Sequence, residues 1–174
     1  MKKIALLLLS VVVLLSCVTT VYDSAGNPIS KEQLQKMKAM AVSKHLRDRR
    51  YRIFVDRVYP MRGPSFTLMD TWGIEVSGDS IGLFLPYFGR IYQVPFDRRM
   101  GLHFIAPLET YQEEITKKGV RIKMQTGSGI EHCTITMEVY ANGQTDLQVN
   151  SSNRELIRYL GEMQLNDAIR MKTE

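Results

Sequence analysis

Cysteine and histidine are scarce in this chain. The 174 residues include two cysteines and three histidines, His45, His103 and His132, which lie far apart on different predicted elements. His132 and Cys133 are neighbours on a predicted strand, where consecutive side chains face opposite ways, so they cannot easily bind one ion together. We therefore predict no metal and no cofactor. Cys133 is interpreted as a small buried apolar residue, and His132 as an exposed one.

The arrangements of familiar hydrolases are also lacking. Nucleophilic catalysis needs a nucleophile beside a base, and we expect no serine in a Gly-x-Ser-x-Gly nucleophile elbow or in a Ser-x-x-Lys helix. Glu113 and Glu114 are adjacent on a predicted strand and point apart, whereas a glycosidase needs two carboxyls about 5–10 Å apart across a cleft. Residues 127–129 are glycine-rich but separate two strands, so they lack the helix N-terminus that a phosphate loop uses. We predict no catalytic residues and a protein that is not an enzyme.

Long apolar runs occur only at the N-terminus. Two lysines precede an apolar run over residues 4–15, which is followed by Ser16 and Cys17. A basic start, an apolar core and a small residue before the break are typical of a secretory signal peptide. The run is shorter than the roughly 20 residues of a membrane span. We therefore predict that residues 1–16 are a signal peptide.

The junction Leu14-Leu15-Ser16-Cys17 resembles the lipobox of bacterial lipoproteins. In that family the peptide is cut before the cysteine, which then carries diacylglycerol and a further acyl chain such as palmitate. Two or more acyl chains give stable anchoring to a bilayer. The resemblance implies that Cys17 is lipidated and that residues 17–29 tether the protein to the membrane. No acidic run follows Cys17, which favours the outer membrane with the domain facing the periplasm.

The net charge and the length of the chain further limit the class of protein. Loss of the two lysines with the signal peptide lowers the net charge from +5 to +3. This mild excess, without a clustered basic face bearing stacking aromatics, argues against a nucleic-acid binder. The remaining length suits one domain with a substantial core. If Cys17 is lipidated, Cys133 has no partner for an internal disulfide, although the compartment would permit one.

A basic helix is predicted over residues 30–50. Ser30 and Gln33 have the spacing of a capping box, and the apolar stripe that follows is poorly defined. The basic residues of this segment are Lys36, Lys38, Lys44, Arg47, Arg49 and Arg50. Two interpretations stay open: the helix is a solvated spacer, or its basic side contacts anionic lipid near the tether.

Residues 51–164 change to the period of two that is typical of strands. Turn signals separate the strands at Gly78-Asp79, at residues 117–119 and at Asn142-Gly143, the last a pair that favours a type I′ turn. We expect separate strands over 65–70 and 72–77, over 102–105 and 111–116, and a resumed strand over 91–94. About nine short strands without βαβ spacing predict a mainly β fold, an antiparallel curved sheet closed as a barrel or stacked as a sandwich, after one N-terminal helix. Residues 165–174 are predicted to be a short helix or a frayed tail.

Four short segments, in this order and spacing, resemble one protein family. They are Tyr59-Pro-Met-Arg-Gly-Pro64, Glu75-Val-Ser-Gly-Asp79, Leu85-Pro-Tyr-Phe-Gly-Arg90 and Val149-Asn-Ser-Ser-Asn-Arg154. The resemblance extends over residues 51–163 and is to an uncharacterised group of Gram-negative bacterial lipoproteins, the domain of unknown function four-two-five-one. The chain departs from it in a charged tail after Met163 and in Arg98-Arg99, where the family is often glycine-rich. The resemblance implies a periplasmic or outer-membrane lipoprotein and no particular activity.

Two loops combine proline, aromatic residues and arginine. The candidate binding residues on them are Tyr59, Arg62, Tyr87, Phe88 and Arg90. Aromatic residues beside arginine often form binding hot spots, but the same residues also shape strand corners and cap a core. If both loops meet at one end of the sheet, the binding interpretation is favoured.

The functional expectation is a non-enzymatic envelope lipoprotein. It is held to the lipid bilayer through acylated Cys17 and binds an envelope protein, or a small apolar or glycan ligand. The alternative is a hydrolase acting on an envelope polymer, which requires a cleft where carboxylates such as Asp56 and Glu75 converge. A third alternative is a purely structural role for the basic helix as a spacer.

Overall fold

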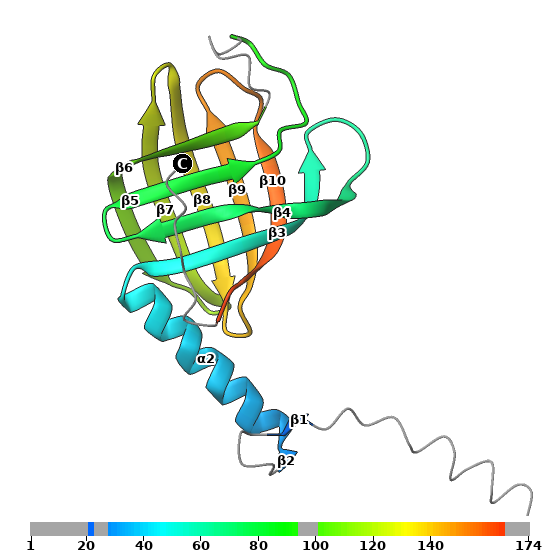
Figure 1. Ribbon diagram of the computed structural model, residues 1–174, viewed down its shortest axis with the longest axis vertical. Helices are drawn as coiled ribbons and strands as arrows, with labels where there is room; N and C mark the ends of the chain where they lie inside the picture. Colours follow the sequence, from blue (N-terminus) through cyan, green and yellow to red (C-terminus); the bar gives the residue numbers. More distant parts are fainter. Residues whose placement is uncertain (1–20, 23–27, 94–100, 166–174) are drawn as a thin grey trace, which may run out of the picture. The chain divides into compact units, whose positions relative to one another are not determined.

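The computed structural model describes residues 21–22, 28–93 and 101–165. The chain divides into two compact units, Met1–Lys36 and Met37–Glu174. The elements are β1 (Val21–Tyr22), β2 (Pro28–Ile29), α2 (Lys31–Arg47), β3 (Arg50–Pro60), β4 (Phe66–Ser77), β5 (Ser80–Leu85), β6 (Leu102–Ile115), β7 (Gly119–Ser128), β8 (Glu131–Tyr140), β9 (Gln144–Ser151) and β10 (Ile157–Met163) (Figure 1). The prediction for the C-terminal tail lies outside the described residues from residue 166 onward.

The helix α2 begins with the predicted capping box. Ser30 N donates to Gln33 Oε1 at 3.0 Å, and Gln33 N donates to Ser30 Oγ at 3.1 Å. These bonds satisfy backbone donors that the first helical turn leaves without partners. The helix ends at Arg47, and Arg49 just beyond it has a φ of 47°. Gly78 N donates to Arg49 O at 2.9 Å, which ties the end of the helix to the turn between β4 and β5.

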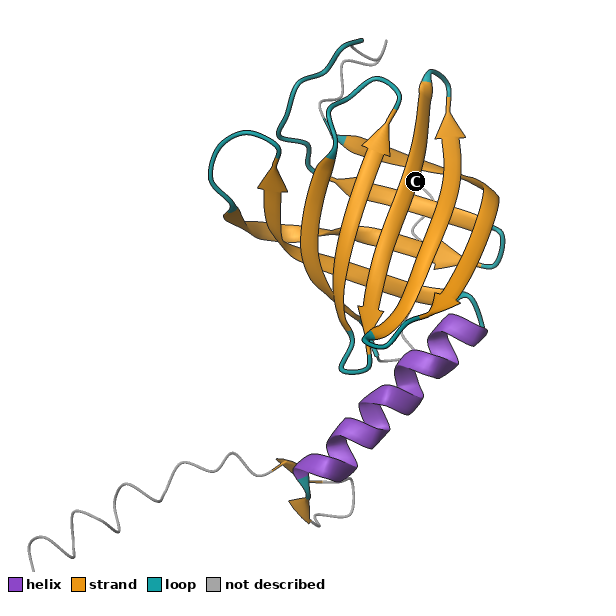
Figure 2. Cartoon of the chain, turned by 180° about the vertical axis from the view of Figure 1, so that it is seen from behind, coloured by secondary structure: helices purple, strands orange, loops and turns teal. Residues whose placement is uncertain are grey.

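The eight strands β3–β10 form a closed barrel. Each strand pairs antiparallel with its neighbour in sequence, and β10 returns to pair with β3, so the order around the barrel is β10-β3-β4-β5-β6-β7-β8-β9. Figure 2 shows the later strands running steeply across the earlier ones. The antiparallel prediction is confirmed, and the choice between barrel and sandwich resolves to a barrel because the ladder leaves no unpaired first or last strand.

Two predictions of separate strands are wrong: that of residues 65–70 and 72–77, and that of residues 102–105 and 111–116. Residues 66–77 are one strand in which Val55 of β3 pairs with Trp72 and Arg57 pairs with Thr67, so residues 68–71 project out of the ladder. The strand β6 is also continuous, but it pairs with β5 up to Pro107 and with β7 from Leu108 onward. Pro107 has no N–H to donate, and such residues are tolerated where strand pairing is irregular.

Two local predictions also need correction. The β8–β9 hairpin has a three-residue loop in which Gly143 has a φ of 93° while Asn142 has none of the positive φ that a type I′ turn requires. The strand expected over residues 91–94 reduces to one isolated bridge between Ile91 and Arg154, and Val94 lies outside the described residues. The conformation of each loop depends on residues that are distant in the sequence, so a short sequence window does not predict it.

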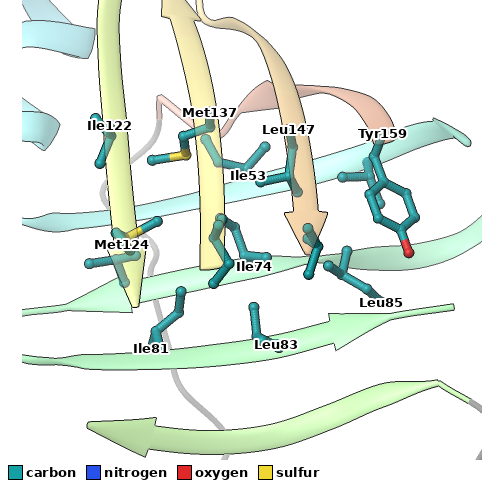
Figure 3. Packing of buried hydrophobic residues seen from close by; sticks show 14 of the residues in the cluster. Ile53, Ile74, Ile81, Leu83, Leu85, Ile122, Met124, Met137, Leu147 and Tyr159 are labelled. Carbon is teal, nitrogen blue, oxygen red and sulfur yellow. The ribbon is translucent and has the colours of Figure 1, made fainter. Parts of the chain in front are cut away.

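The interior of the barrel is filled by large side chains. The largest that are fully buried are Tyr51, Tyr159, Ile53, Ile74, Ile81, Leu83, Leu85, Leu102, Ile122, Met124, Ile135 and Met137. Figure 3 shows side chains from β7, β8 and β9 meeting those of β3, β4 and β5 across the interior. Cys133 belongs to this core with 2% exposure, and His132 beside it is exposed, as predicted. An eight-stranded barrel is narrow enough for its own side chains to fill it.

The seam between β10 and β3 generates a test of the fold. The register shifts there between Leu160 and Gly161, and a Cβ built on Gly161 would lie 1.9 Å from Phe54 O. We expect Gly161→Ala to lower the free energy of unfolding by about 1–3 kcal/mol or more, the usual cost of overpacking. Denaturant unfolding of the variant measures this change. Gln148→Ala, at an exposed position of β9, is the control and should change stability by less than about 0.5 kcal/mol; equal effects would contradict this account of the seam.

Candidate binding surface

The two loops singled out in the sequence meet at one end of the barrel. This loop end consists of residues 61–65, 86–93, 129–130 and 152–156, which connect the strands on that side. The rings of Phe66 and Phe88 meet edge to face, with centroids 4.7 Å apart. Arg62 Nε lies 3.4 Å from Glu155 Oε1. The condition that favours the binding interpretation is therefore met.

Tyr87 holds the long loop in place. Its side chain is 8% exposed, and its hydroxyl lies 2.7 Å from Glu155 O and 2.9 Å from Arg90 O. Burial raises the pKa of Tyr87 to about 12, so the hydroxyl stays protonated and can donate. Glu155 N donates to Arg90 O at 3.0 Å and Tyr92 N donates to Asn153 O at 2.7 Å. Tyr87 is therefore a structural residue rather than a free contact residue.

A buried ion pair lies beneath Tyr87. Arg154 Nε is 2.7 Å from Glu131 Oε1, and their side chains are 1% and 7% exposed. Ser151 Oγ donates to the other oxygen of the Glu131 carboxylate, and the Arg154 guanidinium lies 5.1 Å from the centre of the Tyr87 ring. This cluster was not predicted from the sequence. The available signal was Glu131, a charged residue in phase with the inward-facing Cys133 and Ile135.

Large apolar side chains stay exposed around this fixed framework. We call them the loop-end rim: Met61, Phe66, Phe88, Tyr92 and Ile130, which are 38–68% exposed. Exposed apolar side chains that cluster, rather than scatter, often mark an interaction site. Hydrogen bonds and the ion pair link the described parts of the loops beneath these side chains.

The structure places the predicted binding residues in different environments. Phe88 is exposed on the rim, and Arg62 and Arg90 are exposed beside it. Tyr59 lies on β3 instead of a loop, and the Arg158 guanidinium lies 5.2 Å from its ring centre. Tyr59 pairs with Arg158 across the strands, so its placement in the loop was wrong.

The carboxylates required by the hydrolase alternative do not converge. Glu75 pairs across the ladder with Arg52, while Asp56 lies further along β3 beyond the Val55–Trp72 pair. Four residues of strand separate Asp56 from Arg52, about 13 Å, which exceeds the spacing that two-carboxylate catalysis uses. Among the described residues, no three His, Cys, Asp or Glu side chains gather as they would around a metal ion.

Contrary to the expectation above, the sequence contains one Gly-x-Ser-x-Gly pattern. Residues 78–82 read Gly-Asp-Ser-Ile-Gly and fit the letters of a nucleophile elbow. The structure places Gly78 and Asp79 on the turn between β4 and β5, and Ser80, Ile81 and Gly82 at the start of β5. A nucleophile elbow joins a strand to a helix, so this strand-to-strand turn does not present Ser80 in that way.

Glu75 and Cys133 are two buried titratable groups outside the rim. Glu75 is 3% exposed, and its Oε1 has no hydrogen-bond partner among the described residues. Desolvation raises the pKa of Glu75, and the nearby positive charge of Arg52 offsets part of this effect. Burial, with a smaller effect from the charge of Glu131, raises the pKa of the Cys133 thiol to about 12. The thiol is therefore protonated at neutral pH and unreactive.

Fold and loop end together define a class: an eight-stranded antiparallel barrel with a core of large side chains and exposed apolar side chains at one end. A family model described as "Domain of unknown function (DUF4251)" matches residues 33–163, and the chain belongs to that family. The chain is similar to the crystal structure of a DUF4251 family protein from Bacteroides eggerthii DSM 20697, with a TM-score of 0.59 at 12% identity, covering 72% of this chain and 86% of that one. This likeness supports the fold. No curated protein matches. Within the described part, no helix is long and apolar enough to cross a membrane.

The buried ion pair makes a first prediction for this end of the barrel. Arg154→Ala should lower the free energy of unfolding by about 3–5 kcal/mol, because it leaves the buried charge of the Glu131 carboxylate without its positively charged partner. Arg121→Ala is the matched control: Arg121 also pairs with carboxylates, but its side chain is 47% exposed. It should cost at most about 1 kcal/mol. Denaturant unfolding of both variants tests the difference, and similar costs would show that the Arg154 pair does not hold the loop end.

Glu75 makes a second prediction, about pH. Its pKa is higher in the folded chain than its ordinary value of 4.5, so the carboxyl favours the fold while protonated and this contribution is lost as the pH rises through the folded pKa. Glu75→Gln should therefore raise the melting temperature at pH 7, with a smaller gain near pH 4. Thermal unfolding at both pH values measures this. Glu114→Gln, whose side chain is 69% exposed, is the control; a Glu75→Gln effect independent of pH would argue against the burial cost.

Proposed function

We propose that this chain is a lipid-anchored, non-enzymatic lipoprotein of the bacterial envelope whose loop-end rim binds another envelope protein. The observation that carries the proposal is the rim: five large apolar side chains are exposed at the loop end, four of them on loops and Phe66 at the start of β4, where its ring meets that of Phe88. A typical binding hot spot has aromatic residues beside arginine in an ordered setting. Phe88 and Tyr92 beside Arg62 and Arg90 fit that description.

The large side chains buried in the barrel support a protein partner over a small ligand. Ligand-binding barrels of this size hold one small molecule inside the barrel, whereas residues such as Tyr51, Tyr159 and Met124 occupy that space here. A rim of apolar side chains around a packed end suits a protein surface, which covers area rather than entering a cavity. The partner would bind over the end of the barrel.

The N-terminal segment supports the location. The apolar run over residues 4–15 and the Leu-Leu-Ser-Cys junction have the form of a lipoprotein signal. Acylation of Cys17 would hold the domain to a bilayer through the tether of residues 17–29. The outer membrane with the domain facing the periplasm fits the absence of an acidic run after Cys17.

A crosslinking pull-down from intact cells tests this proposal. The double variant Phe88→Ser and Tyr92→Ser should retain the fold, because both side chains are exposed, and should lose at least about tenfold of the captured partner, since one hot spot is worth about 2 kcal/mol. Ile115→Ser is the matched control: Ile115 is 89% exposed on the hairpin at the opposite end of the barrel.

Two outcomes would count against the proposal. Capture of the same proteins by wild type and by the rim variant would mean that the rim is not the contact surface. Capture that is equal with Cys17→Ala would mean that anchoring does not matter for the interaction. Circular dichroism of the purified variants separates loss of binding from loss of folding.

A further inference from the structure

The helix α2 has one buried side and one exposed side within the unit that starts at Met37. Val42, His45 and Leu46 are buried, and His45 Nδ1 lies 2.9 Å from Arg50 O. On the other side, Met37 and Met40 are 52% and 64% exposed. Exposed methionines one helical turn apart are costly in water and act as flexible apolar contacts. The exposed side of α2 therefore has an apolar strip with no cover among the described residues.

Basic residues border this strip. We call Met37, Met40, Ser43, Lys44 and Arg47 the basic methionine face, and most of them line one shallow hollow of the surface. From Lys36 to Arg47 the helix contains no acidic residue, and its acidic residue Glu32 lies in the first turn. Lys38 belongs to another side, because its Nζ lies 3.8 Å from Glu162 Oε1 on β10. The face is thus apolar and positively charged at once.

This combination of apolar and basic side chains favours a membrane surface as the binding partner. Helices that lie in a membrane interface combine apolar side chains, which enter the headgroup region, with lysine and arginine, which meet anionic lipid. Lysine and arginine keep their charged ends at the headgroups while their stems cover apolar surface. A bilayer is also within reach, because the chain from Cys17 to Lys31 spans at most roughly 50 Å when extended.

We infer that the basic methionine face binds the surface of an anionic phospholipid bilayer, with Met37 and Met40 in the headgroup region and Lys44 and Arg47 beside lipid phosphates. The inference rests on the proposed lipid anchor at Cys17, which keeps the helix close to the membrane. It makes the helix a second attachment, so that the barrel is oriented as well as tethered. One anchor alone leaves a domain free to rotate.

A fluorescent probe on the helix tests this. The full chain, purified from envelope membranes with Ser43→Cys, is labelled with an environment-sensitive dye and reconstituted into vesicles of neutral lipid or of neutral plus anionic lipid. Cys133 should not react, because it is buried and its thiol pKa is raised to about 12. We expect the emission to shift to shorter wavelength only with anionic lipid, and the shift to be reversed by high salt. A label at Ser128→Cys, an exposed position at the loop end, should show no shift.

Two variants of the labelled chain separate the contributions. Lys44→Glu with Arg47→Glu should weaken docking by at least about thirtyfold, from about 1 kcal/mol for each lost basic residue. Met37→Ser with Met40→Ser should abolish the wavelength shift even at low salt. A shift that appears equally on neutral vesicles, or one that survives both variants, would overturn the inference.

Flotation of the same vesicles distinguishes failure of the anchor from failure of the face. A chain that floats with both kinds of vesicle but shows no shift at residue 43 is anchored without helix docking, which overturns this inference alone. A chain that floats with neither kind contradicts the anchor and the face together. A chain that floats and shifts only with anionic lipid supports both.

Discussion

Closure of the strand ladder between β10 and β3 is the constraint on which the rest of the structure depends. Without that seam, eight short strands would leave two unpaired edges and an interior open to water. With it, large side chains such as Tyr51 and Tyr159 are fully buried, and hydrophobic burial becomes the main source of stability. The pairing of β10 with β3 includes a register shift at Gly161, where only a residue without a side chain fits beside Phe54 O.

The closed barrel also decides what its two ends can do. At the loop end, the Tyr87 hydroxyl and the Arg154–Glu131 pair fix loops that come from distant parts of the chain. Polar groups that are buried and fully bonded keep a surface in one shape. The exposed apolar side chains of the loop-end rim lie above these bonded groups. At the other end, α2 leaves a basic side with exposed Met37 and Met40. The proposed binding at the loop end and the proposed membrane contact of α2 both involve residues of the unit that starts at Met37.

Much of the fold could be predicted from the sequence, because local signals act over short distances. Ser30 and Gln33 fixed the start of the helix, and the alternation around Cys133 and Met137 fixed which side chains point inward. The continuous strand β6 could not be predicted, because its two halves pair with different neighbours on either side of Pro107. Phe88 and Arg62 were predicted as binding residues and lie exposed at the loop end, where their role stays a prediction. The Glu131–Arg154 pair could not be predicted, because it joins residues from two separate hairpins.

The sequence by itself determined the helix and the approximate positions of most strands, the inward and outward faces of the strands, the apolar run over residues 4–15 and the likeness to a family. Each depends on neighbours within a few residues or on short motifs, and the family match over residues 33–163 agrees with the last. Only the tertiary structure decided that the sheet is a barrel, that the loops of residues 61–65 and 86–93 meet, and that Tyr87 is buried while Phe88 is exposed. The reason is that strand pairing across the β3–β10 seam and burial at the loop end join residues far apart in the chain, and no local pattern records which of them will meet.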